Sequence, residues 1–145
     1  MSLTNQAETD LLELIFNATT WLTLAENKVA GPATDLYISL HTADPGEAPV
    51  GGQAQSESAY TGYARVAVLR TTAGWTVAGN TASNTAAITF PACTALTSTV
   101  THFGIGLAAT GAGNLIASGQ LTASLIINAG ITPQFAIGDL DVTAD

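Results

Sequence analysis

Two short runs of alternating side chains, joined by a long polar loop, constrain the fold of this chain more than any other feature. Residues 36–41 and 63–70 have the alternating pattern of strands, in which successive side chains lie on opposite faces. The loop at 43–62 begins with Asp-Pro-Gly at 44–46, a strong turn signal. We therefore predict two strands around which the rest of the chain is organised. A loop of this length is expected either to become ordered against a partner or to be a mobile surface loop.

The β pattern continues to the end of the chain. Strand-like runs recur at roughly the 8–12-residue spacing that is typical of sandwiches and barrels. They lie at 36–41, 63–70, 74–78, 84–90, 98–107, 113–119, 121–128, 132–136 and 139–143. We predict a mainly β fold, an antiparallel two-sheet β-sandwich of jelly-roll type, with a barrel as the alternative.

The N-terminal segment has helical signals. Thr4 is the expected N-cap of a helix over 5–16, which has acidic residues in its early turns and a wide apolar face. A further helical segment is expected at 19–27. The sequence therefore predicts an N-terminal helical arm over residues 1–33 and a β-sandwich domain over residues 34–145.

The charge content excludes two classes of partner. The formal net charge is −8, and Lys28, Arg65 and Arg70 are the only Lys or Arg residues. Nucleic-acid binding and attachment to an anionic membrane both need clustered cations, so neither is expected. Only 10% of residues are charged, against about 25% in a typical soluble domain. Such a surface suits burial against a protein partner, because few charges must be desolvated.

Residues that could support chemistry are few. His41 and His102 are the only histidines, and a metal site needs three or four ligands, so we expect hydrogen-bonded structural histidines. Cys93 lies among apolar and small residues and is expected to be a buried thiol. Neither a nucleophile motif nor a complete dinucleotide-binding motif is present. We therefore predict no enzymatic activity, no catalytic or metal-binding residue and no cofactor.

Several blocks of sequence follow one another in a characteristic order. They are Leu-His-Thr-Ala-Asp-Pro at 40–45, Gly-Tyr-Ala-Arg at 62–65, Asn-Thr-Ala-Ala-Ile-Thr-Phe-Pro at 84–91 and Thr-His-Phe-Gly-Ile at 101–105. Over residues 35–145 the chain resembles a family of small virion structural proteins of tailed bacteriophages. Some members of that family are described as capsid decoration, or cement, proteins with a jelly-roll fold, and others as minor tail proteins. The resemblance implies a structural role in the virion.

Our leading hypothesis is a capsid decoration protein that stabilises the icosahedral shell by bridging capsomers. Its partners would be the major capsid protein and neighbouring copies of itself. It would be made in the host cytoplasm and lie on the capsid exterior. The alternative is a tail, baseplate or fibre-attachment protein. A second alternative is a carbohydrate-binding module, in which sugars would stack on aromatic side chains, namely Trp21, Trp75, Tyr37, Tyr60 and Tyr63.

The expected contact residues fall into three groups: the apolar helix face, the turn at 44–46, and the aromatic and cationic side chains of the second strand. The interface candidates are Leu11, Leu14, Ile15, Phe16, Trp21, Asp44, Pro45, Gly46, Tyr60, Tyr63, Arg65 and Arg70. The two arginines are also expected to pair with an acidic residue of the long loop, either Asp44, Glu47 or Glu57.

Overall fold

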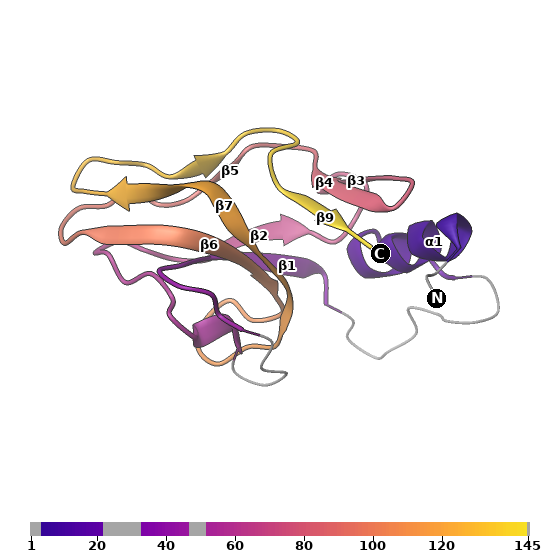
Figure 1. The fold of residues 1–145 in the computed structure, drawn as a ribbon, viewed down its shortest axis with the longest axis horizontal. Helices are drawn as coiled ribbons and strands as arrows, with labels where there is room; N and C mark the ends of the chain where they lie inside the picture. Colours follow the sequence, from indigo (N-terminus) through magenta and orange to yellow (C-terminus); the bar gives the residue numbers. More distant parts are fainter. Residues whose placement is uncertain (1–3, 22–32, 47–51, 145) are drawn as a thin grey trace. The chain divides into compact units, whose positions relative to one another are not determined.

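The computed structural model describes residues 4–21, 33–46 and 52–144 (Figure 1). In chain order the elements are α1 (Asn5–Phe16), β1 (Asp35–His41), the 3-10 helix η1 (Gly52–Ala54), β2 (Val66–Leu69), β3 (Trp75–Ala78), β4 (Thr81–Asn84), β5 (Ile88–Thr89), β6 (Ser98–Gly106), β7 (Leu115–Ile127), β8 (Gln134–Phe135) and β9 (Asp141–Thr143). The prediction of a mainly β chain with a short N-terminal helix is confirmed, and its antiparallel sheets are consistent with a β-sandwich. The jelly-roll connectivity stays a prediction.

The strands form three sheets, and the chain divides into two compact units. The sheets have the strand orders β2-β1-β6-β7, β3-β4-β9 and β5-β8. The first unit, here called the helix unit, comprises residues 1–35, 69–88 and 135–145. The second, the sheet unit, comprises residues 36–68 and 89–134. The helix is therefore grouped with later strands of the chain, whereas the sequence placed a boundary after residue 33.

Helix α1 packs on the β3–β4 hairpin within the helix unit (Figure 1). Its N-cap is Thr4, as predicted, because the Thr4 hydroxyl accepts a hydrogen bond from the backbone N–H of Ala7. The apolar face of the helix buries Leu12 and Phe16. The Phe16 ring meets the buried Trp75 ring edge to face, with 4.7 Å between centroids. The helix is thus part of a hydrophobic core of its own unit.

Arg70 stabilises the other end of the helix. Its Nε and Nη2 donate to the carbonyls of Ile15 and Leu14, which belong to the last turn of α1. Carbonyls at a helix C-terminus lack intrahelical donors, and a cation there also complements the helix dipole. The helix ends at Phe16, and residues 19–21 are not helical, so the prediction of a helix at 19–27 is wrong for those residues. Residues 22–27 lie outside the described part of the chain.

Strand β1 is the centre of the sheet unit. It pairs antiparallel with β6 in a register that runs from Tyr37 opposite Gly106 to His41 opposite His102. The alternation predicted for 36–41 is present, but both faces of the strand are buried. One face supplies apolar side chains, and the other carries Ser39 and His41, which are also buried. The second face must therefore satisfy its polar groups internally.

Strand β7 is one continuous strand of 13 residues where the sequence predicted two, at 113–119 and 121–128. Gly119 is the reason for the difference. It lies directly opposite Phe103 on β6, and a Cβ added to it would come within 2.7 Å of the Phe103 ring. The glycine therefore makes room for a cross-strand aromatic ring and does not form a turn.

Within the strand predicted at 84–90 only β5 forms, and Asn84 is instead the last residue of β4, a strand that the sequence did not predict. Asn84 ends β4, and its buried side chain donates to the carbonyls of Ala86 and Ala136 and accepts from the N–H of Leu140. A side-chain amide that bonds to nearby backbone groups competes with the strand ladder, so the chain leaves the regular strand after Asn84. This interruption was not evident from the alternating pattern.

Candidate functional site

A buried polar cluster lies on the sheet unit around the guanidinium of Arg65. The Arg65 side chain is only 2% exposed and forms a bidentate ion pair with Glu57, with Nε–Oε1 and Nη2–Oε2 distances of 2.7 Å. Nη1 donates to the carbonyl of Ala108 at 2.8 Å. Nη2 also lies 2.8 Å from the carbonyl O of Gly111 and 3.2 Å from that of Gln53. We call Arg65, Glu57, Tyr63 and Gln53 the Arg65 cluster.

Tyr63 joins the ion pair to the central strand. Its hydroxyl donates to Glu57 Oε1 at 2.8 Å and accepts from the N–H of Leu40 at 3.1 Å. Burial, aided by the neighbouring Glu57 carboxylate, raises the pKa of Tyr63 far above its usual value. The bonds to Glu57 raise the pKa of Arg65. Both groups are therefore fixed in one protonation state, which suits a structural contact better than proton transfer.

Gln53 fixes the central part of the loop to the β6–β7 connection. Its side chain donates to the carbonyl of Tyr37 at 3.0 Å and accepts from the N–H of Ala108 at 3.2 Å. A Cβ added to Gly106 or Gly113 would come within 2.3 or 2.4 Å of the Gln53 side chain. These two glycines thus provide the space in which Gln53 is completely buried.

His41 anchors the middle of the same loop. Its Nδ1 lies 2.7 Å from the carbonyl of Gln55, so this nitrogen carries the proton, and its Nε2 lies 2.8 Å from the Ser39 hydroxyl. Burial lowers the pKa of His41. The prediction of a hydrogen-bonded structural histidine is confirmed for this residue. Because Ser39 and His41 are both fully buried, the pair offers no surface to a substrate.

The described part of the long loop therefore packs on its own sheet. Residues 52–62 contain three buried side chains, those of Gln53, Ser58 and Tyr60, and the backbone of Ser56 and Ser58 bonds to the end of β1. The expectation that the loop needs a partner to become ordered is corrected for these residues. Residues 47–51 lie outside the described part of the chain.

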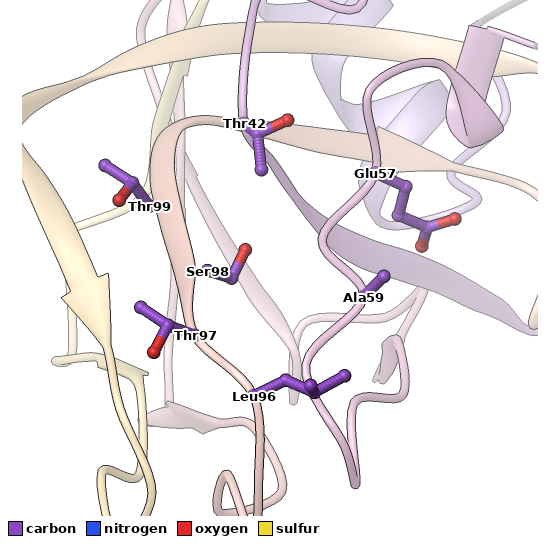
Figure 2. Close-up of a pocket in the computed structure, with 7 residues that line it drawn as sticks. All are labelled: Thr42, Glu57, Ala59, Leu96, Thr97, Ser98 and Thr99. Carbon is purple, nitrogen blue, oxygen red and sulfur yellow. The ribbon is translucent and has the colours of Figure 1, made fainter.

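A shallow hollow of about 600 Å³ opens beside the Arg65 cluster. Figure 2 shows Leu96, Thr97, Ser98 and Thr99 along one side and Glu57 and Ala59 on the facing segment. Ser58 and Ser98 hydroxyls bond to each other at 2.8 Å, and the Glu57 carboxylate is committed to Arg65 and Tyr63. The hollow therefore has hydroxyls but no base positioned to activate one of them. Among the described residues no group of three or more His, Cys, Asp or Glu could hold a metal ion.

The structure places the predicted interface residues in different environments. Phe16, Tyr60 and Pro45 are buried within their own units and have little surface to offer a partner. Asp44 and Gly46 are exposed in the predicted turn, where Asp44 Oδ1 accepts from the Gly46 N–H. The remaining candidates are partly exposed or hydrogen-bonded inside the fold, and they are Leu11, Leu14, Ile15, Trp21, Tyr63, Arg65 and Arg70. Only the expected pairing of an arginine with Glu57 is confirmed, for Arg65.

The carbohydrate-stacking aromatics are mostly not available at the surface. Trp75 is fully buried and Tyr60 is 3% exposed, with its hydroxyl bonded to the carbonyl of Pro91. Tyr63 is enclosed between Tyr60 and Phe90. Sugar-binding platforms need exposed ring faces, and the buried rings of Trp75 and Tyr60 provide none.

The comparison with protein families decides what kind of protein this is. A family model described as podophage GP4 fiber I protein gp80 matches residues 2–143. The chain belongs to this family. It is therefore a structural protein of a tailed-phage family, as the sequence resemblance implied. None of the curated proteins compared with this fiber I family member matches it. No helix within residues 4–21, 33–46 and 52–144 is long and apolar enough to cross a membrane.

The sequence reasoning missed one prominent surface of this fiber I family member. Strand β7 is an edge strand of the four-stranded sheet, and it exposes Ile116, Leu125 and Ile126. The chain carries no Asp, Glu, Lys or Arg between residues 71 and 138, a stretch that contains all of β6 and β7. That charge-free stretch is visible in the sequence and would have directed attention to β7.

Proposed function

We propose that this chain is a structural subunit of a tail fibre that works by packing against other protein subunits. The family description supports the proposal, because it names a fiber protein of a podophage. The observation that carries it is the uncharged edge strand β7 with its exposed apolar side chains. Such a surface can be buried between subunits at little desolvation cost.

The Arg65 cluster supports a mechanical role for the rest of the sheet unit. Its charged and polar groups are bonded to each other and to backbone carbonyls of the loop and of the β6–β7 connection. A fully bonded, buried network holds loops in one conformation. In this proposal the cluster keeps the sheet unit rigid, while β7 makes the contacts with neighbouring subunits.

Capsid decoration was the leading hypothesis from the sequence. It predicts a different location of the protein in the virion and a different copy number. A decorating protein covers a shell built from many copies of the major capsid protein, whereas a fibre subunit occurs only at the tail. Copy number therefore separates the two roles. Quantitative mass spectrometry of purified virions, with the major capsid protein as internal reference, measures it directly. A small fraction of the capsid copy number supports the fibre role, and near-equal numbers support decoration.

Complementation tests the surface that carries the proposal. A phage lacking this chain is supplied with the wild-type protein, with Ile126→Lys on β7, or with Ile137→Lys as the matched control. Ile137 is 69% exposed and lies outside β7. We expect the wild type and Ile137→Lys to be incorporated into virions and Ile126→Lys to be lost. Equal incorporation of all three proteins would mean that β7 is not the assembly surface.

A further inference from the structure

Strand β7 lacks most of the features that prevent sheet edges from pairing with other chains. Among the described strands it pairs with β6 alone, at the end of the order β2-β1-β6-β7. Edge strands are normally protected by charged residues, proline or short length. The 13 residues of β7 include no charge and no proline. Ile116, Leu125 and Ile126 are 38%, 37% and 57% exposed along it.

The sequence of β7 is nearly symmetric about its central residue. Read outward from Leu121, the paired positions are Gln120 with Thr122, Gly119 with Ala123, Ser118 with Ser124, Ala117 with Leu125, Ile116 with Ile126, and Leu115 with Ile127. Every pair joins residues of the same character, and two pairs are identical. An antiparallel strand pair related by a two-fold axis brings together these positions, because residue i faces residue j and j faces i.

We propose that β7 pairs antiparallel with β7 of a second copy of this chain, about a two-fold axis at Leu121. Ile116 then lies opposite Ile126 of the other copy, and Ser118 lies opposite Ser124. The two four-stranded sheets become one continuous eight-stranded sheet. The apolar residues at both ends of β7 lose their exposure, and directly opposed aliphatic pairs are the contacts that stabilise such ladders.

The irregular part of β7 fits this arrangement. The register with β6 shifts between Val100 and His102, so that residues 121–124 lie opposite Thr101 alone. This bulge falls at the proposed axis, where the residues are small or hydroxylated apart from Leu121. Segments 115–120 and 125–127 flank it and carry the exposed apolar side chains, and a second register shift, between Ile105 and Gly106 of β6, leaves Ile116 without an opposite residue on β6. The pairing is therefore concentrated at the two ends of the ladder.

Electrostatics favours a second copy at this edge. Two chains of net charge −8 repel each other over most approaches. Residues 71–138 contain no Asp, Glu, Lys or Arg, so β7 and the strand beside it bring no like charges together. The inference depends on β7 itself and not on where the chain lies in the virion.

Cross-linking between single-cysteine variants tests the register. The background is Cys93→Ser, which preserves a donor to the carbonyls of Ala95 and Leu96. A mixture of Ile116→Cys and Ile126→Cys proteins should cross-link with a short bifunctional maleimide. The Ile116→Cys protein alone should not cross-link. In the proposed dimer, residue 116 of one copy would lie about 33 Å from residue 116 of the other, a separation of ten residues at about 3.3 Å each. Ile137→Cys is the control for random collision.

Sedimentation equilibrium provides the second measurement. We expect a dimer for the wild type and Ile137→Lys, and a folded monomer by circular dichroism for Ile126→Lys. A monomeric wild type, or cross-linking of Ile116→Cys with itself and not with Ile126→Cys, would overturn the inference. If the protein forms a dimer with the expected register but is located on the phage head by antibody labelling, the dimer inference stands and only the fibre role is overturned.

Discussion

Arg65 forms two parallel hydrogen bonds of 2.7 Å with Glu57, and this ion pair holds the described part of the long loop against the central sheet. Glu57 comes from the long loop, whereas Arg65 comes from the strand predicted at 63–70 and lies directly before β2. The Arg65 side chain is almost fully buried, whereas that of Glu57 is 19% exposed. A bidentate pair of this kind is geometrically specific, because the planar guanidinium matches the carboxylate.

The first prediction concerns this pair. Arg65→Met should destabilise the protein by about 3 kcal/mol or more, because it leaves the Glu57 carboxylate and several carbonyls without their donors. Arg65→Lys should lower the free energy of unfolding by a smaller amount than Arg65→Met, because its ammonium group retains a positive charge but cannot form the bidentate ion pair. Urea unfolding followed by tryptophan fluorescence measures the free energies. Equal stability of the wild type and Arg65→Met would show that the cluster is not a structural anchor.

The second prediction concerns the space around Gln53. Gly106→Ala should destabilise the fold by about 1–3 kcal/mol, because the new methyl group would lie within 2.3 Å of the Gln53 side chain before relaxation. In a Gln53→Ala background the same substitution should cost less, since the Gln53 side chain is gone, but part of the cost should remain because the new Cβ would still lie 2.7 Å from the carbonyl O of Asn114. A double-mutant cycle in urea reveals the coupling. Additive losses would contradict the contact.

The third prediction is a pH dependence centred on His41. Burial lowers its pKa in the folded state below the unfolded value of 6.5, so the unfolded chain binds the proton more tightly. The stabilising effect is fully present above pH 6.5 and is lost as the pH falls through the folded pKa. The loss has a slope of at most about 1.4 kcal/mol per pH unit.

Unfolding curves at several pH values between 7.5 and 5 test this dependence. His41→Gln should have lower stability at neutral pH but a flatter profile on acidification. His102→Gln, which changes the other histidine, should keep the steep profile of the wild type. Parallel profiles for the wild type and His41→Gln would show that His41 does not couple protonation to folding.

The fourth prediction concerns the end of helix α1. Arg70→Ala should cost about 1–2 kcal/mol, because the carbonyls of Leu14 and Ile15 lose a charged donor. Hydrogen exchange should show the effect first in the last turn of the helix, with little change in β6. Uniform loss of protection over both units would mean that Arg70 acts more broadly than as a helix cap.

Local signals predicted the elements well where a single stretch of chain decides them. The helix over 5–16 with its Thr4 cap, and the strands near 36–41 and 98–107, follow from periodicity and capping chemistry alone. The errors in the predicted elements occur where a residue distant in the sequence determines the local structure. The sequence divided β7 into two strands after Gly119, because the partner of this glycine, the Phe103 ring, lies on another strand.

The site was less accessible to sequence reasoning for the same reason. An ion pair between one of the two arginines and an acidic residue of the loop was predicted, because cations are scarce in this chain, but Glu57 was only one of three candidate partners. The role of Gln53 depends on Tyr37, Ala108 and two glycines from different parts of the chain, so no local pattern reports it. The edge position of β7 likewise depends on the order of strands in the sheet.

Antibody-gold labelling of intact virions, viewed by electron microscopy, tests the central claim of a fibre subunit most directly. The antibody is raised against the purified chain, and virions lacking the chain serve as the control. The account predicts gold confined to the tail and its fibres. Gold spread over the whole head would contradict it and would establish capsid decoration instead.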